Sequence, residues 1–337
     1  MAIALADIKK LRDMTSAGMM DCKKALEEAE GDFKRAVEIL REKGKSTLAK
    51  RGENETTQGA VLSRINGGKA VLVCLGCETD FVAATPDFKT LAGNIADAAI
   101  AAFPADVEAL KATKLADGYS IEEDITNQAG KTGEKHVLAF YGALEAPFVS
   151  EYVHFNGKLG AIVSFNKQVP AEIARGIAMQ VASMNPVAVD PASVPADVIE
   201  SEKTVAIQKT KDEQVQKAVD NALKKVGINP AHVDSEDHIE SNTAKGWLTP
   251  AQAQQAREII AKVGEETLAS LAQKEQMING IVNGRIQKFL KENTLMEQEY
   301  QLSDDKATVA AALKAVDAAA KVLAFKRFSL SDYSADG

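Results

Sequence analysis

The fold is decided by the stretch Ala70-Val71-Leu72-Val73-Cys74-Leu75-Gly76, which continues as Cys77-Glu78-Thr79-Asp80-Phe81-Val82-Ala83. The first part is short, rich in β-branched residues and bounded by glycines, which predicts a buried strand. Thr85-Pro86 predicts the start of a helix, with Thr85 as its cap and Pro86 in its first turn. The residues in between form a strand-to-helix loop, a place where binding residues are common.

A pattern of hairpin plus helix occurs twice along the chain. Asn66-Gly67-Gly68 and Asn156-Gly157-Lys158 each separate two apolar runs, and Asn-Gly between apolar runs is a strong hairpin signal. A helix with apolar residues at helical spacing follows each hairpin, over residues 88–103 and 170–184. Residues 135–144 form a further strand candidate. We therefore predict an α+β fold with two related hairpin-plus-helix subdomains, over 56–145 and from 146 to 204.

The two copies differ between strand and helix, where the first copy is longer by about the length of residues 77–84. Burial statistics alone favour the core for a lone Phe81 by about two to one. The second copy closes its fold without these extra residues, so they are candidates for binding. This comparison favours an exposed Phe81 over a buried one. We predict that Phe81 is exposed.

Residues 1–55 form a separate module. Helices are predicted near residues 5–14 and 20–29, and a third begins after the cap Asp32 and ends at Gly44. Composition alone slightly favours the small core for Met19 and Met20, with an exposed contact as the alternative. Residues 45–58 are predicted to be a helix tail followed by a flexible linker. The arrangement resembles the ubiquitin-associated three-helix module.

The C-terminal part contains long polar helices. A helix over residues 196–226, a polar loop over 227–245 and a helix that starts at Thr249-Pro250 predict a helical hairpin insertion (a coiled coil) over 205–272. The chain then returns to the second subdomain over 273–337, with a helix over 307–320 and a closing strand over 322–330.

The whole chain has 337 residues, of which 45% are apolar and 26% charged, as expected for a globular protein of two to three domains. The net charge of -8 argues against a general nucleic-acid binder. Three cysteines favour a reducing, cytoplasmic location, and no run reaches the length of a membrane span. Residues 1–51 carry a net +3, which fits either a solvated helix surface or an acidic partner.

Signals for catalysis are weak. Cys74 and Cys77 form a CxxC pair without a second pair, and positions three apart on a strand face opposite sides. Gly130-Lys131-Thr132 resembles the tail of a phosphate loop but lacks its first glycine. The four histidines show no triad or ligand spacing. We predict no catalytic residue, no metal and no cofactor.

Two motifs resemble signatures of the elongation factor Ts family, the nucleotide exchange factors of elongation factor Tu. The first runs from Leu11-Arg12 through the stretch Ala17-Gly18-Met19-Met20-Asp21-Cys22-Lys23-Lys24-Ala25-Leu26 to Gly31-Asp32, and the second is Thr79-Asp80-Phe81-Val82. Ser16 stands where the family often has glycine, which would restrict that turn. The family also has a coiled-coil excursion from its second half.

The resemblance implies binding to elongation factor Tu and release of GDP by disturbance of the partner's Mg²⁺ and phosphate region. It also implies that the N-terminal module docks on the GTPase domain. Motif matching carries partner contacts onto Leu11, Met19, Met20, Lys23, Thr79, Asp80, Phe81 and Val82, and a looser local match adds Gly133, His154 and Leu302. Neither direct nucleic-acid binding nor a membrane is implied, and self-association stays open.

Two other classes compete with an exchange factor. A ubiquitin-associated-type adaptor would bind a ubiquitin-like protein through Met19 and Met20. An oxidoreductase would use Cys74 and Cys77.

Overall fold

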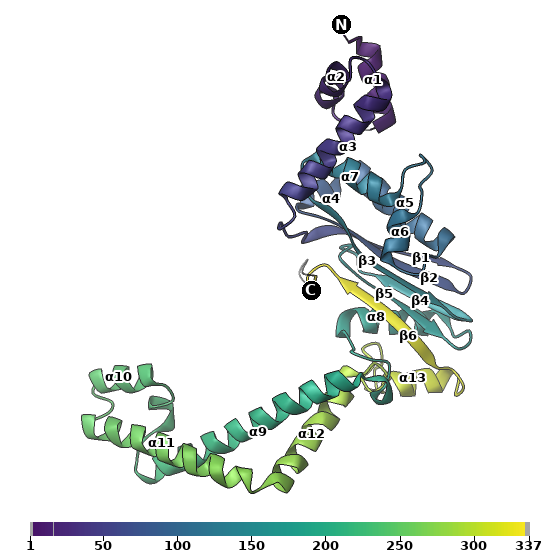
Figure 1. Ribbon diagram of the computed structural model, residues 1–337. Helices are drawn as coiled ribbons and strands as arrows, with labels where there is room; N and C mark the ends of the chain where they lie inside the picture. The colour runs from purple at the N-terminus through teal and green to yellow at the C-terminus, as the bar shows by residue number, and fades with distance from the viewer. Residues whose placement is uncertain (1–2, 16, 334–337) are drawn as a thin grey trace. The chain divides into compact units, whose positions relative to one another are not determined.

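The protein has an α+β fold in a computed structural model that describes residues 3–15 and 17–333 (Figure 1). Ser16, with its predicted effect on the turn, lies outside the described residues. The chain divides into two compact units, Met1–Val189 with Leu295–Gly337, and Asp190–Thr294. Within the described residues, no helix is long and apolar enough to cross a membrane.

The first unit contains two antiparallel sheets of three strands each, in the orders β1-β2-β3 and β4-β5-β6. Their strands are β1 (Gln58–Asn66), β2 (Lys69–Cys77), β3 (His136–Glu145), β4 (Phe148–Val153), β5 (Leu159–Phe165) and β6 (Val322–Ser329). Both predicted hairpins are confirmed, as are the strand after residue 135 and the closing C-terminal strand.

The two sheets pack face to face, because alternate residues of β2 serve two different cores. Leu72 and Cys74 pack with Ile162 of β5 between the sheets. Val73 and Leu75 point to the opposite side and pack against helices. A strand in the middle of a sheet that is covered on both faces is apolar throughout, which explains the continuous apolar run from residue 70.

Helices cover the outer face of each sheet (Figure 1). The first sheet is covered by α5 (Pro86–Ala102), α6 (Val107–Ala112) and α7 (Ile121–Thr132), and the second by α8 (Ala171–Met184) and α13 (Val309–Val316). Helices α5 and α8 agree with the prediction, whereas α6 and α7 were not expected. A signal for α7 is present, since Ser120 and Glu123 form a capping box at its start.

Asp124, in the first turn of α7, is a partly buried carboxylate beside Asp117. Burial, together with the charge and hydrogen bond of Asp117, raises the pKa of Asp124 to about 6. An unfolded aspartate has a pKa of about 3.9, so this group stabilises the fold as pH falls from about 6 to 4. At pH 7 the carboxylate is ionised in both states, and its charge is disfavoured in the folded one.

We expect Asp124→Asn to raise the free energy of unfolding at pH 7 by about 1 kcal/mol, a value reduced for solvent screening. The gain should shrink at pH 5, where the wild-type group is protonated in the folded state. Chemical denaturation at both pH values measures the effect, with the exposed Asp304→Asn as control. A gain that increases as the pH falls would contradict this assignment.

The three N-terminal helices share a small core, as predicted. They are α1 (Leu5–Thr15), α2 (Met19–Glu28) and α3 (Phe33–Lys50), and Asp32 caps α3 as expected.

The predicted end of α3 at Gly44 is wrong, because this glycine is a contact with α7. A Cβ at Gly44 would lie 2.2 Å from the backbone oxygen of Thr126, and a Cβ at Gly130 would lie 3.1 Å from Gly44 Cα. The helix tail predicted after residue 44 is confirmed, since α3 continues to Lys50. The turn that follows is not a flexible linker, because Lys135 Nζ donates hydrogen bonds to the carbonyls of Gly52 and Asn54.

The second unit is built around α9 (Ala196–Lys225). This helix packs with α11 (Pro250–Ala272) through one apolar cluster and with α12 (Glu275–Asn293) through another. Helix α12 lies beyond the expected pair over 205–272, within the segment 273–337, and belongs to this second unit. The segment predicted as a polar loop contains α10 (Glu236–Ala244), because Ile228, Val233 and Ile239 are buried against α9 and α11.

Candidate partner-binding site

A one-turn helix presents Phe81. The expected loop after β2 contains α4 (Asp80–Ala84), capped by Thr79 at its start and followed at once by α5. The Phe81 side chain is 83% exposed, so the prediction of a surface position is confirmed. Asp80 is also exposed, while Val82 and Ala83 pack partly against the core of the first sheet.

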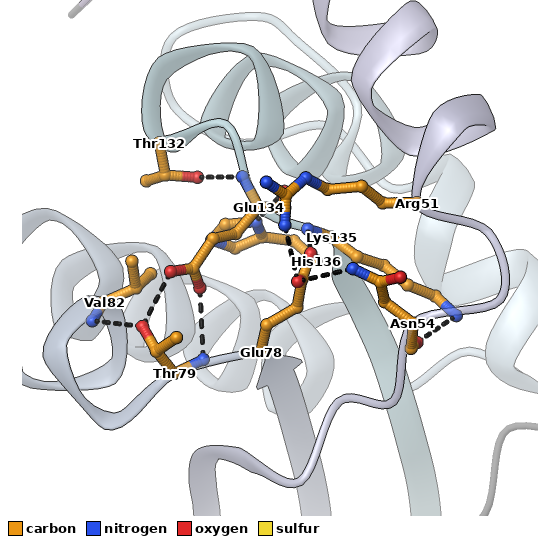
Figure 2. Close-up of polar contacts among 9 residues, drawn as sticks. All are labelled: Arg51, Asn54, Glu78, Thr79, Val82, Thr132, Glu134, Lys135 and His136. Carbon is orange, nitrogen blue, oxygen red and sulfur yellow. Dashed lines mark hydrogen bonds and ion pairs between the residues drawn. The ribbon is translucent and has the colours of Figure 1, made fainter.

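Glu134 and Thr79 hold the start of α4, and we call this pair the α4 clamp (Figure 2). Glu134 Oε1 accepts a hydrogen bond from Thr79 Oγ1 at 2.7 Å, and Glu134 Oε2 accepts one from the Thr79 backbone N–H at 3.1 Å. Thr79 Oγ1 in turn accepts from the Val82 N–H at 3.4 Å. The Thr79-Asp80-Phe81-Val82 motif does not include Glu134. In the nearby sequence, the only signal for the role of Glu134 is its position directly after Gly133.

Gly133 places Glu134. It ends α7 with φ at +76°, a left-handed conformation that glycine adopts without strain. Thr132 Oγ1 then accepts a hydrogen bond from the Glu134 N–H at 3.2 Å. The structure thus brings Gly133, a residue expected from the resemblance, next to the Thr79-Asp80-Phe81-Val82 motif.

A second carboxylate, Glu78, joins the end of β2 to the end of α3. Glu78 Oε2 accepts hydrogen bonds from Arg51 and Asn54, each at 2.7 Å, and Oε1 accepts from the Lys135 N–H at 2.5 Å (Figure 2). Burial opposes ionisation of Glu78, but these three donors outweigh it and lower its pKa. The N-terminal module and α4 are therefore fixed to the same strand end.

The two cysteines below α4 do not form a redox or metal pair. Cys77 packs against the helices and Cys74 packs between the sheets, so they lie on opposite faces of β2 as predicted. Burial and then the charge of Glu134 raise the pKa of Cys77 to about 12, and burial raises that of Cys74. Within residues 3–15 and 17–333, no group of three metal-ligating side chains is present.

His136 is a buried histidine beneath the α4 clamp. Its Nδ1 lies 3.0 Å from the carbonyl oxygen of Glu134, and its Nε2 is buried with no hydrogen-bond partner among the described residues. Burial lowers the pKa of this imidazole, so it remains neutral at pH 7.

The expected contacts of the N-terminal module divide into a buried and an exposed set. Leu11 is completely buried between the three helices of the free protein, and its expected contact with a partner stays a prediction. Met19 is partly buried against the same core. Met20 is 65% exposed and Lys23 is exposed 3.7 Å from Glu27, so these two side chains are available to a partner.

The second hairpin places His154 near its tip, where the Tyr152 hydroxyl lies 2.8 Å from His154 Nδ1. The next residue, Phe155, is 93% exposed and was missed by the sequence analysis, although an aromatic beside an Asn-Gly turn is a usable signal. Leu302, in the segment before α13, is 58% exposed.

The tip of this hairpin reaches the start of β1. The Val61 N–H donates to the Gly157 carbonyl at 2.7 Å, and Lys158 Nζ donates to Gln58 Oε1 at 2.5 Å. Gln58 pairs with Cys77, the last residue of β2 before α4. The hairpin tip and α4 therefore lie at the same end of the packed sheets.

This geometry is typical of a protein that acts by binding, because exposed side chains stand on a firmly fixed support where a partner can contact them. The family model described as Elongation factor TS matches residues 78–332. An elongation factor Ts from Bacteroides thetaiotaomicron is 50% identical over 331 residues, which cover 98% of this chain and 99% of that protein. Proteins of the same description from Bacteroides fragilis and Porphyromonas gingivalis are 49% and 36% identical over the same shares.

The chain therefore belongs to the elongation factor Ts family, the nucleotide exchange factors of elongation factor Tu in translation elongation. Members of this family are not enzymes, and they act in the cytoplasm. The oxidoreductase alternative is excluded by this membership and by the placement of Cys74 and Cys77.

Proposed function

We propose that α4 is the element that releases GDP from elongation factor Tu, with Phe81 and Asp80 as its working side chains. The observation that supports this most directly is the 83% exposure of Phe81 on a short helix whose start is fixed by Glu134. An exposed aromatic side chain gains about 1.5–3 kcal/mol when a partner buries it.

To promote exchange by binding, a protein needs only a higher affinity for the nucleotide-free form of its partner than for the GDP form. If Phe81 is buried in the nucleotide-free form of the partner and not in the GDP form, its burial energy favours the form without nucleotide. The Asp80 carboxylate, at the first position of α4, would enter the Mg²⁺ and phosphate region, where it repels phosphate and competes for the cation. By reciprocity, GDP weakens this protein's binding by the factor by which the protein weakens GDP binding.

Further contacts come from both ends of the first unit. We propose that residues 1–55, a ubiquitin-associated-like module, dock on the GTPase domain through Met20 and Lys23, with Met19 at the edge of that surface. Thr79 and Val82 shape α4, Gly133 positions the α4 clamp, and Leu11 supports the N-terminal module from its core.

The second half of the core makes a further contact through His154 and Leu302. Phe155 is exposed beside His154 and extends this contact surface.

The domain division is also a proposal. We infer that 56–145 and 146–204, with the return over 273–337, are related copies of one hairpin-plus-helix unit, because each hairpin is followed by a helix on the outer face of its sheet. We further infer that the coiled coil over 205–272 is not needed for exchange and serves self-association or a second partner.

The rate of release of fluorescent GDP from purified elongation factor Tu tests the function. We expect a rate that rises with the concentration of this protein and saturates. An adaptor of the ubiquitin-associated type would leave the release rate unchanged and bind a ubiquitin-like protein through Met19 and Met20. Unchanged release at saturating protein would therefore contradict the proposed function.

A further inference from the structure

Helix α4 cannot hold its own position. It spans only Asp80–Ala84 and has no fully buried side chain, and isolated helices of this length are unstable in water. The direction in which Phe81 points is therefore imposed by the rest of the fold, through the partial packing of Val82 and Ala83 on the first-sheet core and through the contacts at the ends of α4.

The contact at the start of α4 has an unusual form, because one carboxylate binds both polar groups of the cap residue. Glu134 accepts from the Thr79 N–H and from the Thr79 hydroxyl, which leaves the hydroxyl's lone pairs for the Val82 N–H (Figure 2). Hydrogen bonds to an ionised carboxylate are stronger than those between neutral groups. The cap is thus held in one rotamer by a residue distant in sequence.

We propose that Glu134 is a positioning residue for nucleotide exchange, which acts through Thr79 on the orientation of Phe81. This inference rests on the proposed function of Phe81. Glu134 need not touch elongation factor Tu. If Phe81 is held in its productive orientation before binding, it loses less conformational entropy in the complex. Its own support is local, since Gly133 and Thr132 fix its backbone.

The test is a double-mutant cycle between Glu134→Ala and Phe81→Ala, measured as the maximal rate of GDP release from elongation factor Tu. We expect Glu134→Ala alone to lower this rate about five- to tenfold, within the usual range for coupled residues. In the Phe81→Ala background the same change should lower it less than about twofold, because the side chain that Glu134 positions is already absent. The half-saturating concentration should change little.

Four further variants separate positioning from folding. Glu134→Gln keeps the shape but offers only one acceptor oxygen, so it should give an intermediate rate with an unchanged melting temperature. Glu122→Ala, an exposed glutamate at the other end of α7, is the matched control and should behave as wild type. Thr79→Val should reproduce Glu134→Ala, and Thr79→Ser should retain activity.

Each outcome decides one point. If Phe81→Ala has no effect, the proposed function of α4 fails. If Phe81→Ala slows release and Glu134→Ala does not, the positioning role is wrong. If Glu134→Ala slows release equally in both backgrounds, Glu134 acts independently of Phe81 and the inference is overturned.

Discussion

Replacement of Phe81 by alanine is expected to slow catalysed GDP release about tenfold or more and to leave the melting temperature nearly unchanged. Each tenfold change in rate corresponds to about 1.4 kcal/mol, and burial of a phenylalanine by a partner contributes about 1.5–3 kcal/mol. Because 83% of the side chain is exposed in the free protein, its removal takes little from the fold. Asp80→Ala should act in the same direction but less, since its charge is partly screened.

A thermal melt beside the release assay measures both effects. Phe88→Ala is the matched control, because Phe88 lies seven residues further on, in α5, and is completely buried. That variant should lose about 3–5 kcal/mol of stability. A Phe81→Ala protein that melts like the Phe88 variant, or that releases GDP at the wild-type rate, would contradict our assignment.

Gly44→Ala is expected to destabilise the protein by about 1–3 kcal/mol and to weaken its binding to elongation factor Tu. Helix propensity alone predicts a gain of about 1 kcal/mol for this change in the middle of α3. The added Cβ would, however, lie 2.2 Å from the backbone oxygen of Thr126, and a backbone atom cannot move aside as a flexible side chain can. Helices α3 and α7 must separate, which displaces the N-terminal module.

Denaturant unfolding and the half-saturating concentration in the release assay measure this prediction. The control is Gly93→Ala in α5, where an added Cβ meets nothing within 4 Å, and there the propensity gain of about 1 kcal/mol should appear. A Gly44→Ala protein as stable as this control would show that α3 and α7 are not in close contact. Lower stability with unchanged binding would contradict docking through the module.

The Glu78 contacts connect these two predictions. Since Arg51 and Asn54 bind the carboxylate next to Thr79, displacement of α3 also disturbs the strand end that carries α4. We therefore expect Gly44→Ala to reduce the maximal release rate as well as the affinity.

Local signals in the sequence determined the elements and the exposed aromatic. The Asn-Gly turns predicted both hairpins, the continuous apolar run from residue 70 predicted the doubly covered strand β2, and Thr85-Pro86 predicted the start of α5. These succeed because turn geometry, strand burial and helix capping depend on residues close together in the chain. The exposure of Phe81 was predicted from the comparison of the two hairpin-plus-helix copies, since the first copy is longer at this point.

Only the tertiary structure decided which residues that are far apart in the sequence come into contact. A glycine often follows the end of a helix, but Gly44 lies inside one, where its missing side chain allows close packing with α7. Leu11 matches a binding motif and yet is core, and the segment over 227–245 contains a helix because α9 and α11 bury its apolar residues. Glu134 lies 55 residues from Thr79 in the sequence. This contact follows from the pairing of β2 with β3, whose last pair is Cys77 with His136, and no local pattern of charge or hydrophobicity encodes it.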